Sequence, residues 1–268
     1  MKRQRLCFFI FFLILLALSM HVMAEENISF VVVSDLHLSE KEGIKHFSSL
    51  IKQMNELEPK PEFVVVTGDI HAKEFENVFD ELKPEIPFHI VFGNHEKRED
   101  RKIFMHMFPQ DFKQNDFYSF VHRNAKFIIL CDASDTGDHI GHFESEGIKG
   151  QEQQNWLEQE LNVDRQQYPF IFIFAHIPPN HEGKAGNMYL SSNDQKALSE
   201  ILKKYKPNAM FCGHLHKREK YIIGETPVFI LPSLNWNFED FSPEFYYVRT
   251  EGETFHVDNI KLNIPEEK

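Results

Sequence analysis

Aspartate, asparagine and histidine stand together in five short clusters along the chain, and these residue types bind transition metals through oxygen and nitrogen. The clusters are Ser34-Asp35-Leu36-His37, Thr67-Gly68-Asp69, Gly93-Asn94-His95-Glu96, His176 and Gly213-His214-Leu215-His216. Carboxylate, amide and imidazole groups suit Zn, Fe or Mn, whereas softer metals favour thiolates, which none of the clusters contains. Two such ions that share a carboxylate lower the pKa of a bound water and neutralise the oxygens of a phosphoryl group under attack. The clusters therefore predict a two-metal centre suited to phosphoryl chemistry.

Each cluster follows directly on a short apolar run. The runs are residues 30–33, 63–66, 88–92, 170–175 and 209–212. Runs this short, apolar on both faces and rich in Val, Ile and Phe, predict buried strands. Amphipathic stretches over residues 47–57 and 75–82 separate the first three runs and predict helices. Because ligands bind at the carboxyl ends of the strands in such sheets, we expect the five clusters to converge on one edge of a mostly parallel sheet.

The remaining segments predict a less regular arrangement. Residues 117–121 and 127–130 predict a hairpin, 152–161 a helix, and 221–223, 228–231, 246–249 and 255–262 further strands. The late strands resemble a second, more antiparallel sheet, so we expect two sheets face to face with helices outside them. The polar segment 133–150 is expected to be an exposed loop near the site.

The five clusters, taken in order, resemble the calcineurin-like metallophosphoesterases over roughly residues 28–235. The resemblance implies an α/β fold, a four-layer α/β/β/α sandwich of two mixed sheets. It also implies that Asp35, His37 and His216 bind a first metal, that Asn94, His176 and His214 bind a second, and that Asp69 bridges the two. By the same resemblance, His95 would lie over the site without binding metal, and would protonate the leaving oxygen or stabilise charge on the phosphate.

This resemblance implies an activity but names no substrate. With two Mn, Fe or Zn ions, the chain would hydrolyse a small phosphodiester or phosphomonoester by attack of metal-bound hydroxide. Purple acid phosphatases carry a metal-binding Tyr three residues after the bridging Asp, where this chain has Ala72. The pattern is therefore closer to the cyclic-nucleotide phosphodiesterase-like branch, although Glu96 stands where an Asp is often found. The alternative function is a catalytically silent scaffold for protein binding, but such members typically lose ligands that this chain keeps.

Other polar or aromatic residues near the clusters form weaker patterns. His181, in the loop after His176, is a candidate for contact with the substrate. His71 is interpreted as a solvated loop residue, the alternative being a side chain that points into the cleft. His139 and His142, together with Asp135 and Asp138, are interpreted as a polar loop rather than a further metal site. Trp236 and Phe238 either cover a face of the substrate or pack against the protein.

The first 24 residues differ in character from the rest. Basic residues at positions 2, 3 and 5 precede an apolar run over residues 6–20, and Val22-Met23-Ala24 follows it, which is typical of a signal peptide cleaved after Ala24. The run is also close to the shortest length that spans a bilayer, so an uncleaved anchor is the alternative. Either way we expect residues 25–268 to form the metallophosphoesterase domain outside the cytoplasm, periplasmic or secreted. Membrane contact is expected only through an uncleaved leader.

Charge indicates which binding partners to expect, and cysteine content indicates which disulfide is possible. The formal charge is −12 overall, and −15 without the leader, from 26 basic and 41 acidic residues. An acidic body without a Lys/Arg stripe disfavours binding to a nucleic-acid polymer. Cys131 and Cys212, the only cysteines after the leader, form either one disulfide or two buried thiols.

Overall fold

A computed structural model of the chain describes residues 27–113, 115–143, 153–181, 187–238 and 242–265. The predicted leader, residues 1–24, and residues 144–150 of the expected loop lie outside these ranges. Within them, no helix is long and apolar enough to cross a membrane.

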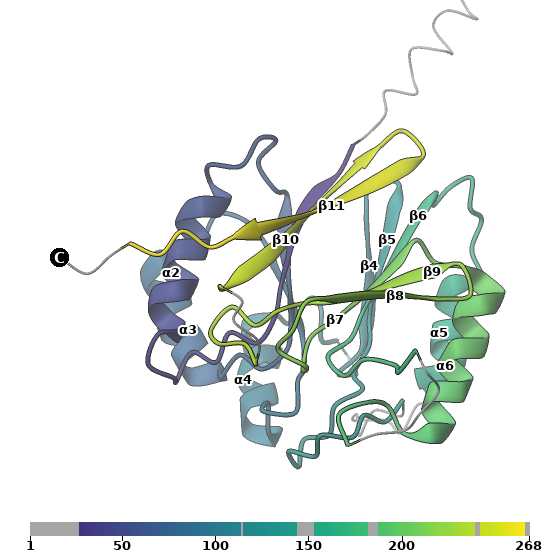
Figure 1. Cartoon of the computed structure of the whole chain (residues 1–268), viewed down its shortest axis with the longest axis horizontal. Helices are drawn as coiled ribbons and strands as arrows, with labels where there is room; N and C mark the ends of the chain where they lie inside the picture. Colours follow the sequence, from purple (N-terminus) through teal and green to yellow (C-terminus); the bar gives the residue numbers. More distant parts are fainter. Residues whose placement is uncertain (1–26, 114, 144–152, 182–186, 239–241, 266–268) are drawn as a thin grey trace, which may run out of the picture.

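The strands form two mixed sheets (Figure 1). The first has the order β11–β10–β1–β2–β3, with β1 (Ser29–Val33), β2 (Phe63–Thr67), β3 (Phe88–Val91), β10 (Glu244–Glu251) and β11 (Thr254–Lys261). The second has the order β4–β5–β6–β7–β9–β8, with β4 (Tyr118–His122), β5 (Ala125–Ile129), β6 (Phe170–Phe174), β7 (Ala209–Cys212), β8 (Glu219–Ile223) and β9 (Thr226–Ile230). Strands β1 to β3 run parallel, as do β5, β6, β7 and β9. Each parallel set therefore brings its carboxyl ends to one edge.

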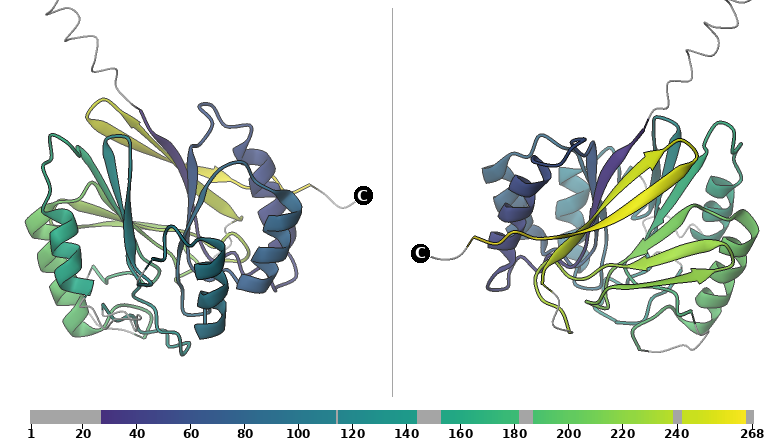
Figure 2. Two further views of the ribbon diagram at one scale, coloured as in Figure 1. Left: turned by 180° about the vertical axis from the view of Figure 1, so that it is seen from behind. Right: turned by 45° about the horizontal axis from the view of Figure 1, so that its top comes forward.

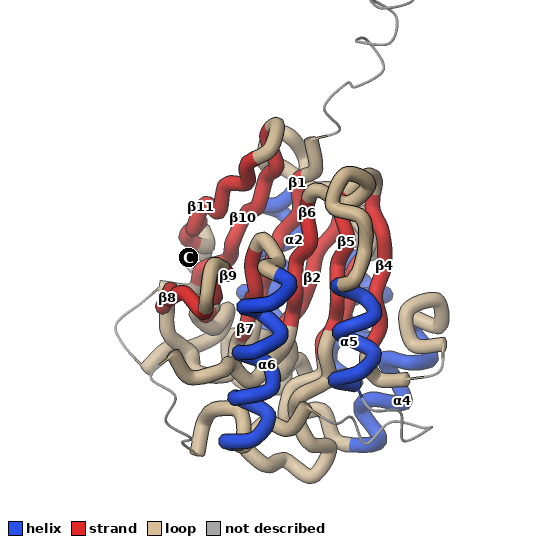
Figure 3. Tube along the Cα trace, turned by 90° about the vertical axis from the view of Figure 1, so that its right-hand side faces the viewer, coloured by secondary structure: helices blue, strands red, loops and turns tan. Residues whose placement is uncertain are grey.

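Helices cover the outer face of each sheet (Figures 1 and 2). Beside the first sheet lie α2 (Gly43–Met54), α3 (Ala72–Leu82) and α4 (Arg98–Met107). The second sheet is covered by α5 (Gln153–Leu161) and α6 (Ser192–Tyr205), which stand in front of its strands in Figure 3. The predicted α/β/β/α sandwich is thus confirmed.

Phenylalanine rings fill the space between the two sheets. Phe30 of β1 stacks on Phe63 of β2, with 5.1 Å between ring centroids. The same ring meets Phe127 and Phe172 of the second sheet edge-on, at 5.3 Å each. Such pairs contribute about 0.5–1.5 kcal/mol beyond the burial of their area. This packed layer holds the carboxyl ends of the two parallel sets opposite each other.

Some details of the predicted arrangement are wrong. The five ligand-bearing strands do not share a sheet, because β1 to β3 belong to the first and β6 and β7 to the second. Among the described strands, the late ones form no separate sheet either, since β8 and β9 extend the second and β10 and β11 the first. Apolar periodicity identifies a strand but not its partners. Cys131 and Cys212 are buried free thiols, as the alternative to a disulfide predicted.

Candidate metal centre

The loops after β1 and β2 stay joined beyond the strands themselves. The N–H of Asp35 donates to the carbonyl of Gly68, and the N–H of His37 to that of Asp69, at 3.0 Å each. Six residues at the strand ends have left-handed backbone, with φ between 41° and 73°: Asp35, His37, Asp69, His71, His214 and His216. This conformation is uncommon for residues with a Cβ, and such strain persists where the surrounding structure holds it in place. These residues lie where the ligand atoms converge, at the carboxyl ends of the parallel strands.

Two glycines allow the loops to approach one another. Gly68 has a φ of 91°, and a Cβ there would lie 2.5 Å from Nδ1 of His176. A Cβ on Gly93 would overlap the carboxylate of Asp69. A side chain at either position would therefore displace a predicted ligand.

The first group of convergent donor atoms comes from Asp35, His37, Asp69 and His216, all of them buried. One ligand atom from each lies within 4.8 Å of the others. Nε2 of His216 is 3.1 Å from Nε2 of His37 and 3.1 Å from Oδ1 of Asp35. Despite that short distance, Oδ1 of Asp35 has no hydrogen-bond partner among the described residues. Four buried donor atoms this close together are arranged as ligands around a common ion would be.

The second group consists of Asp69, His176 and His214, so Asp69 belongs to both groups. Nε2 of His176 lies 3.2 Å from Oδ2 of Asp69 and 3.1 Å from Oδ1 of Asn94. Nε2 of His214 is buried and has no hydrogen-bond partner within the described ranges. The structure thus brings all seven predicted ligands together, with Asp69 between the two sets.

Main-chain carbonyls orient two of the imidazoles. Nδ1 of His176 is 2.7 Å from the carbonyl oxygen of Thr67, and Nδ1 of His216 is 2.9 Å from that of Trp236. A ring nitrogen beside a carbonyl must carry the proton, so in the neutral ring Nε2 keeps its lone pair for a metal. Metal-binding histidines are usually held in this way. Together with the buried atoms that lack hydrogen bonds, this donor set of carboxylates and imidazoles suits the binding of divalent metal.

Electrostatics in the buried site keep the carboxylates ionised. Burial alone would raise the pKa of Asp35 and Asp69, but the neighbouring imidazoles lower both below the ordinary value. Burial lowers the pKa of His37 to about 4 and that of His214 to about 3. For His176 burial acts in the same direction, yet the Asp69 carboxylate raises its pKa to about 10. Near neutral pH the site therefore offers two anionic carboxylates and two imidazoles with free lone pairs.

His95 lies at the open side of this cluster. Its side chain is 44% exposed, whereas Asp69 beneath it is almost fully buried. Nε2 of His95 is 3.9 Å from Oδ2 of Asp69, and its main-chain N–H donates to Oδ1 of Asp69 at 2.9 Å. This position suits a group that meets the substrate rather than one that surrounds a metal ion.

Glu96 connects the loops after β2 and β3, a role that the sequence did not reveal. Its carboxylate accepts main-chain N–H groups from Asp69 at 2.8 Å, Ile70 at 2.7 Å, His71 at 3.3 Å and Gly93 at 2.7 Å. Burial raises the pKa of Glu96, and the N–H donors of Ile70 and Gly93 oppose that rise. The side chain holds the loop of the predicted bridge in its strained conformation.

The structure also places the three weaker candidates. His181 lies against Tyr221, with 4.8 Å between ring centroids, and near Glu219, so its position gives no support to contact with the substrate. His139 lies next to the second group, with its ring centroid 5.5 Å from that of His214. His71 lies next to the first group, 5.5 Å from His37.

Two aromatic side chains border the first group on another side. Trp236 contacts His216, with 4.1 Å between ring centroids, and is 40% exposed. Phe238 lies edge-on to Trp236 at 5.0 Å and is 69% exposed. Trp236 therefore both packs against a predicted ligand and presents surface to solvent.

Comparison with known proteins agrees with this geometry. A sequence model of the family described as calcineurin-like phosphoesterase matches residues 28–218. Among solved structures, a dimetal phosphatase from Danio rerio has a TM-score of 0.65 at 16% identity, covering 88% of this chain and 99% of that one. GAP50, the anchor in the inner membrane complex of Plasmodium, has a TM-score of 0.59 at 14% identity, covering 90% of each chain.

A putative 5′-nucleotidase from Staphylococcus aureus has a TM-score of 0.55 at 14% identity, covering 91% of this chain and 55% of that one. No curated protein gives a significant sequence match. At these identities the structural likenesses show the fold alone. The family match covers most of the chain, including the predicted ligands from Asp35 to His216, and the chain belongs to the calcineurin-like phosphoesterase family.

Proposed function

We propose that the chain hydrolyses a small phosphodiester or phosphomonoester with the help of two bound transition-metal ions, Mn, Fe or Zn. The observation that supports this best is the pair of buried ligand groups that share Asp69. Polar atoms without hydrogen bonds are costly in a protein interior, yet Oδ1 of Asp35 and Nε2 of His214 are buried without a hydrogen-bond partner among the described residues, and Oδ1 of Asp35 has only its ion pair with His216. Metal ions would satisfy both atoms.

Each predicted residue has a part in this proposal. The first ion would be held by Asp35, His37 and His216, the second by Asn94, His176 and His214, and Asp69 would bridge them. When bound, the two ions would activate a water as nucleophile and neutralise charge on the phosphoryl oxygens. His95, at the open side, would donate a proton to the leaving oxygen.

The subclass is proposed from Ala72, the first residue of α3. Ala72 is fully buried and has no oxygen to offer a metal, so it cannot replace the Tyr ligand of purple acid phosphatases. We therefore place the chain nearer to the cyclic-nucleotide phosphodiesterase-like branch. Glu96 replaces an Asp in that pattern, and here its side-chain carboxylate accepts hydrogen bonds from main-chain N–H groups.

We also propose that the domain works outside the cytoplasm, because of the basic and apolar leader. Its acidic charge favours a small phosphoester over a nucleic-acid polymer as substrate. The complete ligand set argues against the alternative of a silent scaffold, since a scaffold has no need of seven convergent metal-binding side chains.

Purified protein loaded with Mn²⁺, Fe²⁺ or Zn²⁺ tests the proposal. It should hydrolyse bis-p-nitrophenyl phosphate, p-nitrophenyl phosphate or both, and a panel of cyclic nucleotides, mononucleotides and sugar phosphates should then identify the natural ester. Protein that binds the metals but hydrolyses none of these esters would favour the scaffold.

A further inference from the structure

His71 occupies a backbone position that local energetics would give to another residue type. It is the residue that precedes α3, with φ 73° and ψ 96°, and its side chain makes no capping hydrogen bond. Ser, Thr, Asp, Asn and Gly are the residues favoured before a helix, and Gly and Asn tolerate positive φ best. The main-chain N–H of His71 is held by Glu96 at 3.3 Å. The backbone conformation does not favour histidine here, so we expect the contacts of the imidazole to explain why a histidine is present.

The imidazole of His71 is directed toward the candidate metal centre. Its ring centroid lies 5.5 Å from that of His37 and 5.8 Å from that of His95. One ring nitrogen from each of these three residues lies within 4.8 Å of the others. The half-buried His71 thus stands beside His95 at the open side of the site.

Ser39 determines which nitrogen of His71 carries the proton. The main-chain N–H of Ser39 donates to Nδ1 of His71 at 3.1 Å, and the Ser39 hydroxyl oxygen lies 2.6 Å from the same nitrogen. A nitrogen that accepts a main-chain N–H has its lone pair occupied, so the proton of the neutral ring is on Nε2. Nε2 is then a hydrogen-bond donor, and neither nitrogen has a lone pair available for a metal ion.

We propose that His71 binds the substrate, with Nε2–H donating to a non-bridging phosphoryl oxygen of the phosphoester. The inference rests on the proposed function, because it needs a phosphoryl group at the metal centre. Charged phosphoryl oxygens are strong acceptors, and the tautomer that Ser39 fixes gives His71 a donor for them on Nε2. His95 and His71 then divide the work, with His95 at the leaving oxygen and His71 at an oxygen that stays on phosphorus.

The variant His71→Asn separates this role from a structural one. Asn accepts positive φ and caps helices, so the thermal midpoint should stay the same or rise. Metal content should also be unchanged. The affinity of the Mn²⁺-loaded protein for inorganic phosphate, measured by calorimetry, should fall roughly 10–100-fold, the loss expected for one hydrogen bond to a charged group. The matched control is Lys83→Asn at the other end of α3, also at positive φ (44°), which should leave phosphate affinity unchanged.

Hydrolysis adds a second readout. In His71→Asn, kcat/KM should fall by the same factor for p-nitrophenyl and phenyl leaving groups, whereas the loss in His95→Ala should be larger for the poorer, phenyl group. Loss of metal from His71→Asn would overturn the inference by making His71 a ligand, as would unchanged phosphate affinity or a wild type that binds no phosphate. If the wild type hydrolyses no ester but His71→Asn still weakens phosphate binding, the proposed hydrolysis fails, while the hydrogen bond from His71 to a phosphoryl oxygen is upheld.

Discussion

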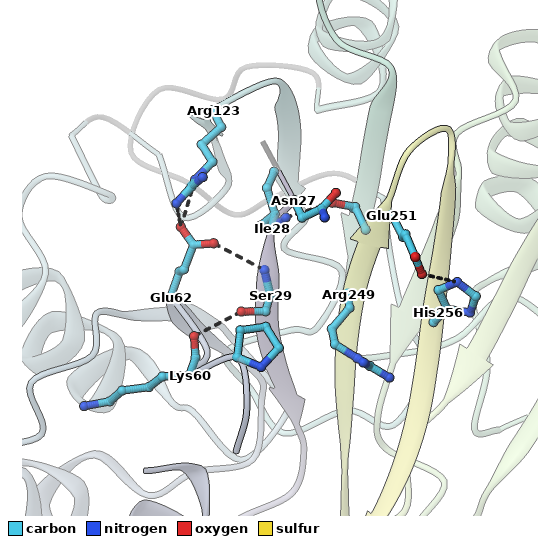
Figure 4. Close-up of a pocket in the computed structure, with 11 residues that line it drawn as sticks. Asn27, Ile28, Ser29, Lys60, Glu62, Arg123, Arg249, Glu251 and His256 are labelled. Carbon is cyan, nitrogen blue, oxygen red and sulfur yellow. Dashed lines mark hydrogen bonds and ion pairs between the residues drawn. The ribbon is translucent and has the colours of Figure 1, made fainter. Parts of the chain in front are cut away.

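The two ends of the sandwich hold similar residue types but use them differently. At the amino end of β1, a cavity of about 680 Å³ is lined by side chains of both charges (Figure 4). There Glu62 pairs with Arg123 at 2.8 Å and accepts the main-chain N–H of Ser29, and Glu251 pairs with His256. At the carboxyl end, acids and imidazoles are buried, and several of their atoms have no partner among the described residues.

The two ends differ in how their charged side chains are partnered. At the amino end Glu62 and Glu251 already have cationic partners, so a ligand that bound either carboxylate would have to displace an existing pair. Even there, Nε of Arg249, which also lines the cavity, has no hydrogen-bond partner among the described residues. At the carboxyl end the missing partners are what metal ions would supply. Backbone strain follows the same division, because six of the nine non-glycine residues with positive φ in the described part of the chain lie at the carboxyl end.

Removing the shared carboxylate should have the largest effect on this contrast. Asp69→Asn removes the one carboxylate that both ligand groups share, so metal and activity should be lost together. Elemental analysis and a p-nitrophenyl ester assay on the same preparation measure this, and hydrolysis should drop to the uncatalysed background. Intact activity in the variant would rule out Asp69 as the bridge.

His95→Ala should separate chemistry from metal binding. Since His95 lies at the open side and is 44% exposed, its loss should leave the metal content unchanged. Turnover should nevertheless fall by roughly 10²–10⁴, the range for a lost acid–base group. Loss of metal in this variant would instead make His95 a ligand.

Glu96→Gln tests whether the strain at the carboxyl end is held by one side chain. The amide nitrogen would face main-chain N–H groups that the carboxylate now accepts, so buried donors would lose their partner. We expect a destabilisation of about 2–3 kcal/mol in urea unfolding and a metal affinity lower by roughly 10–100-fold. The exposed Glu85→Gln is the control and should change neither.

The smallest effects are expected at the amino end. Arg123→Ala removes a half-exposed ion pair with Glu62, and such pairs contribute about 0–1 kcal/mol. Unfolding should shift within that range while kcat and KM stay at wild-type values. A large loss of activity would mean that the amino end contributes to catalysis, and that the two ends do not act independently.

Much of the centre could be predicted from the sequence because strand-end ligands are local patterns. An apolar run followed by Asp35 or Asp69 identifies both the strand and the edge to which it delivers its ligand. Strand pairing could not be predicted, since it depends on contacts between distant segments. The sequence left the orientation of His71 open for a related reason: it depends on Ser39, 32 residues earlier in the chain. Glu96 had one signal, a carboxylate three residues after Gly93, but its four donors appear only in the folded loops.

The most direct test of the two-metal centre is the stoichiometry of metal binding. Metal-free wild-type protein, titrated with Mn²⁺ or Zn²⁺ and checked by elemental analysis, should take up about two ions per chain, as a bridged pair requires. Uptake of a single ion, or of none, would contradict the assignment of Asp69 to two overlapping sites.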